Sequence, residues 1–166
     1  MFDTSLTCSF TGHRPNSLPW GEDETDKACK LLKLELFETV RRVIENGYTH
    51  FIVGGAMGVD TYSAEIVIQL KKIYPHVTME IAIPCLTQSK RWDEASQKRY
   101  KTILKNCDKK TVVSVAYTQY CMHLRNQYMV NNCSLLVAVS NGNDGGTQNT
   151  IKYAKTKKIE TIILNI

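Results

Sequence analysis

The chain has 166 residues, of which 43% are hydrophobic and 22% are charged. This length and balance predict one globular domain, residues 1–166, and exclude a second full domain as well as a collagenous, mucin-like or wholly disordered chain. The net charge of +5 favours anionic partners in general but falls short of the footprint of a dedicated DNA-binding protein.

Apolar runs and amphipathic stretches alternate from the start of the chain. Turn-forming residues separate them, among them Asn46-Gly47, which is a typical helix stop, and Pro75, which ends the second helix. In chain order, the first half predicts a strand at 5–10, a helix at 26–46, a strand at 50–53 and a helix at 59–74.

The alternation continues through the second half. Residues 135–139 are continuously apolar, which is typical of a strand buried on both faces. The expected elements are strands at 77–83, 111–115, 135–139 and 161–164, and helices at about 92–107, 119–131 and 147–157. Together they predict an α/β fold: a single Rossmann-like domain with a mostly parallel sheet of about six strands and helices on both faces.

Location and redox state follow from features that the sequence lacks. No run approaches the roughly 20 apolar residues of a membrane span, and the first five residues do not resemble a secretion signal. We therefore expect a cytoplasmic protein without a membrane partner. The six cysteines form no C-x-x-C pair, so we interpret them as reduced, mostly buried side chains and predict no metal site.

Two glycine turns stand where ligands bind in such sheets, at the carboxyl ends of strands. Backbone N–H groups at a helix start attract anions, which makes phosphate the natural ligand of each turn. Glycine is also common in ordinary strand-to-helix turns, so a purely structural role stays open for either one alone. The residues of these two turns are Gly54, Gly55, Met57 and Gly58, and Gly145, Gly146 and Thr147.

Charged residues near the strand ends extend this predicted site. Arg14, with Thr11, Gly12 and His13 in the loop after the first strand, suits a phosphate group or a base edge. Asp60 either holds ribose hydroxyls or only caps its helix.

A charge within an apolar helix face marks another part of the expected site. Arg125 shares its face with Met122 and Met129, which indicates either a ligand-binding arginine or one that extends from the core rim to a carboxylate. The neighbouring Asn126 orients a ligand or faces water. Gln88 and Trp92 are expected to form a pocket wall, although Trp92 is equally suited to fill space under its loop.

Taken in order, these runs resemble the YpsA-like branch of the SLOG superfamily. The runs are T-G-H-R-P at 11–15, G-G-A-M-G-V-D at 54–60, P-x₃-Q-x₃-W at 84–92, R-N-x-x-M at 125–129 and D-G-G-T at 144–147. That superfamily is similar to the lysine-decarboxylase-like LOG enzymes and to the DNA-processing protein A domain. The resemblance implies a Rossmann-like fold and a pocket for nucleotides or nucleotide-derived ligands.

The chain departs from the LOG enzymes at their catalytic residues. LOG enzymes cleave the N-glycosidic bond of nucleoside monophosphates with an arginine-lysine pair and a glutamate that follows a glycine motif. Here Arg125 matches the arginine, Asn126 replaces the lysine, and residues 148–150 supply no carboxylate. A carboxylate stabilises the oxocarbenium-like state of this cleavage, so its loss weakens the hydrolase hypothesis. Asp144 and Glu65 remain as substitutes from another direction.

Three functions follow as hypotheses. The leading one is a module that senses or sequesters a phosphorylated nucleotide-derived molecule, without a cofactor. The alternative is a phosphoribohydrolase-like N-glycosidase with Arg125 as candidate catalytic residue. The third is single-stranded nucleic acid binding, for which few aromatic residues accompany the basic doublets. Rossmann-like domains often pair through outer helices, so a homo-oligomer is compatible with each of them.

Overall fold

The chain folds as alternating strands and helices, and the computed structural model describes residues 2–166. The strands are β1 (Thr7–Gly12), β2 (His50–Val53), β3 (Thr78–Cys85), β4 (Lys109–Ser114), β5 (Leu135–Ser140) and β6 (Glu160–Asn165). They form one sheet in the order β4-β3-β2-β1-β5-β6, in which every neighbouring pair is parallel. The predicted α/β, Rossmann-like fold is therefore confirmed.

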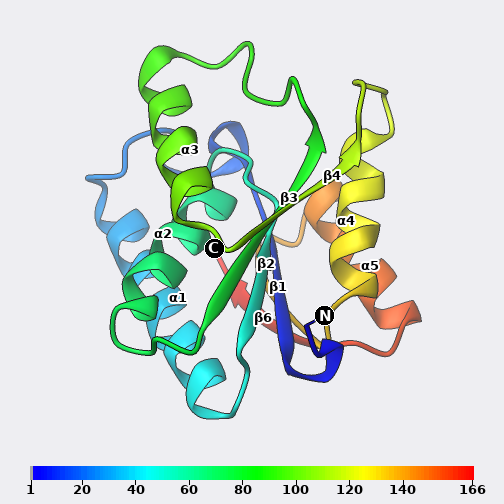
Figure 1. Ribbon diagram of the computed structural model, residues 1–166. Coiled ribbons are helices and arrows are strands. Elements are labelled where there is room, and N and C mark those ends of the chain that lie inside the picture. The colour runs from blue at the N-terminus through cyan, green and yellow to red at the C-terminus, as the bar shows by residue number, and fades with distance from the viewer. Residues whose placement is uncertain (1) are drawn as a thin grey trace.

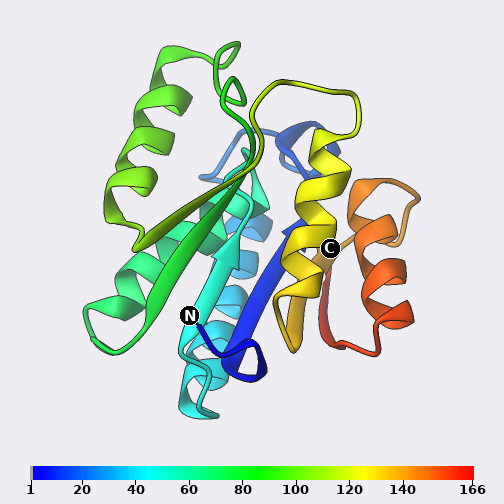
Figure 2. The ribbon, with the colours of Figure 1, turned by 45° about the vertical axis from the view of Figure 1, so that its right-hand side comes forward.

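Helices cover both faces of the sheet. They are α1 (Lys27–Glu45), α2 (Val59–Lys71), α3 (Glu94–Asn106), α4 (Cys121–Asn131) and α5 (Gly146–Thr156), with short 3₁₀ helices at Thr4–Leu6 (η1) and Pro15–Ser17 (η2). Figures 1 and 2 show α1, α2 and α3 on one face and α4 and α5 on the other. Because the chain changes face between β1 and β5, the helices that follow these two neighbouring strands diverge and leave a crevice.

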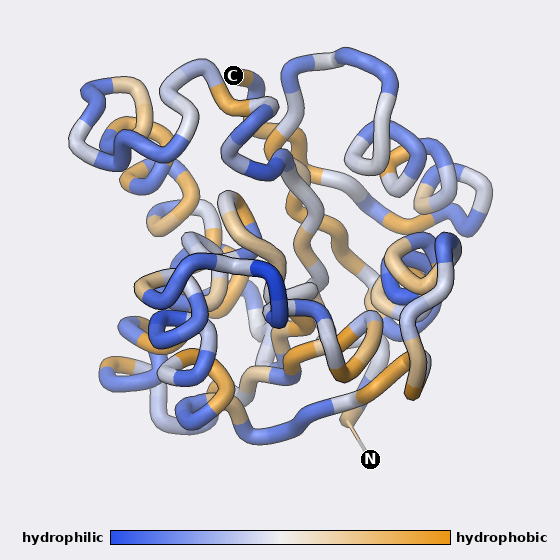
Figure 3. The backbone as a smooth tube through the Cα atoms, turned by 90° about the horizontal axis from the view of Figure 1, so that it is seen from above, coloured by the Kyte–Doolittle hydropathy of each residue, from blue (hydrophilic) through white to orange (hydrophobic). Residues whose placement is uncertain are grey.

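The sheet is buried in its centre and more exposed at its edges. Every residue of β2 and β5 is buried, whereas most residues of the edge strands β4 and β6 are partly or fully exposed. Seen from above, the tube changes repeatedly between hydrophilic and hydrophobic residues along the outer helices (Figure 3). This pattern fits helices that pack one face on the sheet and expose the other.

Local capping sets the ends of several elements. The Asp26 carboxylate accepts hydrogen bonds from the N–H groups of Ala28 and Cys29, at 2.7 and 3.3 Å, and so begins α1. Gly47, with φ of +100°, ends that helix. The first strand starts at Thr7, two residues later than expected, because the Asp3 side chain caps η1 through Ser5.

A buried carboxylate ties three strands to α4 at the opposite end of the sheet from the crevice. Glu80 is 1% exposed and accepts hydrogen bonds or ion pairs from His50, Thr111, Tyr128 and Lys109. Burial raises the pKa of the Glu80 carboxyl, but these partners together outweigh burial and lower the pKa to about 2. Glu80 is therefore a charged but fully bonded part of the core.

All six cysteines are free thiols, and five of them are buried. Within residues 2–166, no helix combines the length and the apolar composition that a membrane crossing requires. In the same range, no three histidine, cysteine, aspartate or glutamate side chains gather in a group suited to a metal ion.

Candidate functional site

A cavity of about 620 Å³ lies in the crevice between β1 and β5, and we call it the switch-point cavity. Its volume is within the usual range of ligand sites, roughly 300–1,000 Å³. It draws on the end of β1, the turn after β5 and the helices α2, α4 and α5. The sequence-predicted site residues that line it are Thr11, Gly12, His13, Arg14, Asp60, Arg125, Asn126, Gly145, Gly146 and Thr147.

The loop after β1 forms one lip of the cavity. A side chain at Gly12 would meet Val59 of α2 within 2.4 Å, so glycine lets the end of β1 approach that helix closely. His13 crosses to the loop after β5, where its Nε2 atom accepts a hydrogen bond from the backbone N–H of Asn141 at 3.1 Å. Burial lowers the pKa of His13, which favours the uncharged imidazole that this bond requires. Arg14 is exposed on the same lip.

The N-terminus of α5 forms the opposite lip and is open. Gly145 precedes the helix without a side-chain cap, and added Cβ atoms at Gly145 and Gly146 would meet nothing within 4 Å. Among residues 2–166, no hydrogen-bond acceptor serves the backbone N–H groups of Gly146, Thr147 and Gln148. These donors lie at the positive end of the helix dipole, an arrangement that can attract an anion.

The other glycine turn is closed by the protein's own carboxylate. The Oδ2 atom of Asp60, in the first turn of α2, accepts a hydrogen bond from the N–H of Ala56 at 3.1 Å. Gly58, with φ of +86°, packs against the backbone of His13, where a side chain would lie 2.5 Å from the carbonyl oxygen. Ala56 and Asp60 therefore line the cavity, whereas the glycines of this turn do not.

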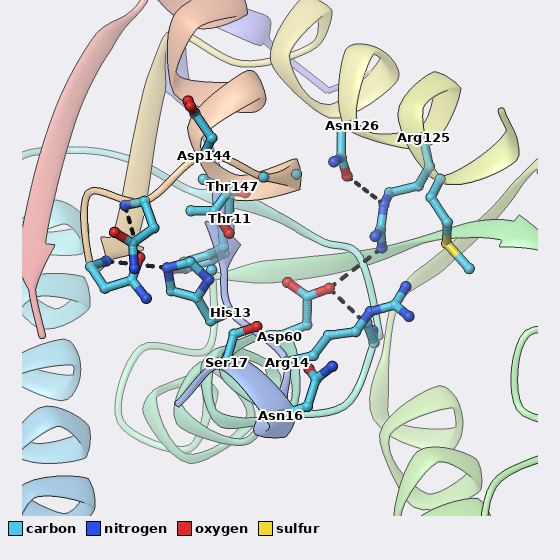
Figure 4. Close-up of a pocket in the computed structure, with 18 of the residues that line it drawn as sticks. Thr11, His13, Arg14, Asn16, Ser17, Asp60, Arg125, Asn126, Asp144 and Thr147 are labelled. Atoms are coloured by element: carbon cyan, nitrogen blue, oxygen red, sulfur yellow. Dashed lines mark hydrogen bonds and ion pairs between the residues drawn. The ribbon is translucent and has the colours of Figure 1, made fainter. Parts of the chain in front are cut away.

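Arg125 from α4 completes this closed arrangement and is 5% exposed. Its Nη1 atom donates to the Gly54 carbonyl oxygen at 2.5 Å. Nη1 also lies 3.4 Å from Oδ2 of Asp60, and Nε donates to the side chain of Asn126 (Figure 4). Burial raises the pKa of Asp60 and lowers that of Arg125, and each charge partly offsets the effect of burial on the other. Arg125 is therefore fixed by its buried partners, whereas Arg14 is exposed.

Some expected site residues lie outside the switch-point cavity. Gln88 donates to the Gly55 carbonyl oxygen at 3.3 Å and to the Tyr100 hydroxyl at 3.1 Å, behind the closed turn. Trp92 packs edge to face on Tyr100 and lines a second cavity, together with Met57 and Gly58. The structure therefore places Met57, Gly58 and Trp92 at the second cavity, and Gly54, Gly55 and Gln88 at neither cavity.

Sequence reasoning missed several polar residues that the cavity includes. Asn16 and Ser17 belong to η2, and Asn141 and Asn143 belong to the turn after β5. Their position directly after strand ends was the available signal. Asp144 also lines the cavity, yet its exposed carboxylate pairs with Lys152 at 3.1 Å.

The proposed substitute carboxylates occupy different positions. Glu65 pairs with Arg99 at 2.6 Å and does not line the switch-point cavity. Asp144 lies at the rim, on the loop before α5. Asp60 is the buried carboxylate within the cavity.

Comparisons with known proteins agree with this architecture. Residues 8–163 match the YpsA family, described as the YspA SLOG family. The chain is 31% identical over 132 residues to UPF0398 protein BH1768 of Halalkalibacterium halodurans, which covers 76% of this chain and 69% of that protein. It is 33% identical over 140 residues to the SPbeta prophage-derived protein YoqJ of Bacillus subtilis, which covers 75% of this chain and 80% of that protein.

Two solved structures share the fold. DNA processing protein A from Streptococcus pneumoniae superposes with a TM-score of 0.63 at 14% identity, over 95% of this chain and 49% of that one. DNA processing protein A from Helicobacter pylori, studied for its mode of single-stranded DNA binding, superposes with a TM-score of 0.65 at 15% identity. The match covers 96% of this chain and 65% of that one. The chain thus spans about half and just under two thirds of these proteins. From the match over residues 8–163, this chain belongs to the YpsA family of SLOG proteins.

Proposed function

We propose that this protein binds a nucleotide or a nucleotide-derived phosphorylated molecule in the switch-point cavity, as a sensor or a sequestering module. The observation that carries the proposal is the open N-terminus of α5, whose free N–H groups share a cavity with Arg14 and Arg125. A phosphate group accepts hydrogen bonds from such N–H groups and is attracted by the guanidinium charges.

The polar lining suits the remainder of a nucleotide. Asn126 and the segment Asn16–Ser17 offer donors and acceptors to a base or a sugar, and Met122 and Met129 offer an apolar surface for a ring. The phosphate is assigned to α5 rather than to the Gly54 turn, because Asp60 already accepts the Ala56 N–H there and would repel a second anion.

Thermal denaturation with a panel of mono-, di- and cyclic nucleotides tests the proposal. A ligand at one hundred times its dissociation constant stabilises the folded state by about 2.7 kcal/mol, which raises Tm by roughly 5–10 °C for a chain of this size. Arg14→Ala is expected to weaken binding roughly 10- to 100-fold, because a charge-assisted hydrogen bond is lost. Arg91→Ala removes an exposed arginine that lines neither cavity and is the matched control. No Tm shift with any nucleotide contradicts the proposal.

Single-stranded nucleic acid is the second candidate ligand, favoured by the shared fold with the DNA processing protein A that was studied for single-stranded DNA binding. A terminal nucleotide would use the same cavity, and the following phosphates would lie outside it. This hypothesis predicts oligonucleotide affinity that falls steeply with salt concentration. Oligonucleotide binding that matches mononucleotide binding at every salt concentration argues for the small ligand.

The hydrolase hypothesis now depends on Asp60, the buried carboxylate beside Arg125. Incubation with nucleoside monophosphates and chromatography for free base tests it. Release of base that Asp60→Asn abolishes would establish a catalytic role for this carboxylate, and absence of base leaves binding as the function.

A further inference from the structure

A second cavity, of about 220 Å³, lies on the far side of the closed glycine turn, and we call it the aromatic cavity. Tyr62, Trp92 and Tyr100 contribute its aromatic surface. Tyr62 and Tyr100 are buried, whereas Trp92 is half-buried and packs edge to face on Tyr100, with ring centroids 5.3 Å apart. The volume is below that of a site for a whole drug-sized molecule and suits a single ring system.

Only a narrow ridge separates the two cavities. Consecutive residues of one loop line opposite sides: Arg14 faces the switch-point cavity, and Pro15 faces the aromatic cavity. The same alternation occurs at Ala56 and Met57. The two loops are in backbone contact, since the Val59 N–H donates to the His13 carbonyl oxygen at 3.2 Å. The ridge is therefore about one backbone thick at these positions, and Arg14 stands on it.

The charges of the aromatic cavity differ from those of the switch-point cavity. Glu24 is neutralised by Lys33 and Arg99, and Arg99 also pairs with Glu65. Two further carboxylates line the cavity without a salt-bridge partner among the described residues: that of Glu22, and that of Asp93, which caps α3 by accepting a hydrogen bond from the Ser96 N–H at 2.9 Å. A phosphate is disfavoured beside them, whereas a planar ring with amino or ring N–H donors is favoured.

We infer that the aromatic cavity holds the second ring of a phosphate-bridged ligand, so that the ligand class is a dinucleotide or a nucleotide with a second ring system. This inference rests on the proposed function. One nucleoside occupies the switch-point cavity, the bridging phosphates lead from the N-terminus of α5 past Arg14 and over the ridge, and the second ring stacks on Trp92. A mononucleotide carries one base and so offers no second base to the aromatic cavity.

Calorimetry with matched pairs of ligands tests this inference: adenosine, guanosine, cytidine and uridine mononucleotides against the corresponding dinucleoside diphosphates. Stacking of one base on an aromatic side chain contributes about 1–3 kcal/mol, so the dinucleotide is expected to bind roughly 5- to 150-fold more tightly than its mononucleotide. Trp92→Leu keeps an apolar side chain but removes the ring, and it is expected to abolish that advantage. Trp92→Phe keeps a ring and is expected to retain most of it.

Tyr117→Leu is the matched control, because Tyr117 is an aromatic residue, 68% exposed, that lines neither cavity. Circular dichroism of each variant reports whether it is folded. Equal affinity for both members of every pair, or an advantage that survives Trp92→Leu, overturns the inference while mononucleotide binding still supports the proposed function. Absence of binding by every ligand overturns both.

Discussion

The two glycine turns look alike in the sequence and differ in the structure. Each follows a buried strand and begins a helix, yet the turn at Gly54–Gly58 is filled by Asp60 and held by Arg125, whereas the turn at Gly145–Gly146 is open. The difference comes from one side chain four residues beyond Ala56, which places a carboxylate where an external anion would bind. A glycine turn thus indicates an anion site only if its own helix supplies no competing acid in the first turn.

Gly54→Ala is the change with the largest expected effect. A Cβ atom at this position would lie 1.8 Å from Nη1 of Arg125 and 2.6 Å from Oδ2 of Asp60, so the buried pair must separate. We expect a loss of about 3 kcal/mol or more in the free energy of unfolding, which lowers Tm by roughly 6–12 °C. Thermal denaturation measures it, and a Tm within 2 °C of the unmodified protein would show that the closed turn tolerates rearrangement.

The pH dependence of stability distinguishes the carboxylate in the closed turn from the carboxylate in the sheet. Glu80 has a folded pKa of about 2, below its ordinary value of 4.5, so its contribution of about 3 kcal/mol is present above pH 4.5 and is lost as the pH falls toward 2. Asp60 has a raised pKa, so its contribution is greatest below pH 3.8 and declines as the pH rises through the folded pKa.

Urea denaturation at a series of pH values checks both signs. The stability difference between the unmodified protein and Glu80→Gln is expected to shrink on acidification. The stability of the unmodified protein relative to that of Asp60→Asn is expected to increase as the pH falls over the same range. Parallel curves for Asp60→Asn would show that burial does not control this carboxyl.

Asp60→Asn and Asp60→Ala convert the closed turn toward the open one. Both remove a negative charge from the cavity, so nucleotide affinity is expected to rise about tenfold. Alanine also frees the Ala56 N–H, which asparagine still engages, so Asp60→Ala is expected to bind several-fold more tightly than Asp60→Asn. Calorimetry measures both. Weaker binding by both variants would show instead that the carboxylate contacts the ligand, as an aspartate that holds ribose hydroxyls does.

Gly146→Ala has the smallest expected effect and tests the open turn. The new Cβ atom meets nothing within 4 Å, and alanine restricts the unfolded chain, so stability is expected to rise by about 0.5 kcal/mol. Nucleotide affinity is expected to fall about threefold, because the methyl group lies beside the free N–H groups. A destabilised variant with unchanged affinity would place the ligand away from α5.

The fold was predictable because its signals are local. A continuously apolar run marked residues 135–139, which the structure shows to be buried, and Asn46-Gly47 marked the end of the first helix, which the structure places at Glu45. The two lips of the candidate site followed from the same reasoning, because parallel strands bring their carboxyl ends together. What could not be predicted depends on side chains that meet across the fold. The hydrogen bond from Arg125 to the Gly54 carbonyl oxygen and the position of Trp92 in a separate cavity leave no pattern in the linear sequence, whereas the acid at Asp60, four residues after Ala56, was visible there.

The hydrogen bond between His13 and Asn141 has a consequence for how molecules enter. It links the loops that follow β1 and β5 beside the paired ends of these strands, and the Nε2 atom can accept it only while it carries no proton. Protonation of His13 in acidic solution is therefore expected to break this bond and to place a positive charge beside the cavity. An anionic ligand would then be attracted more strongly at low pH than at neutral pH.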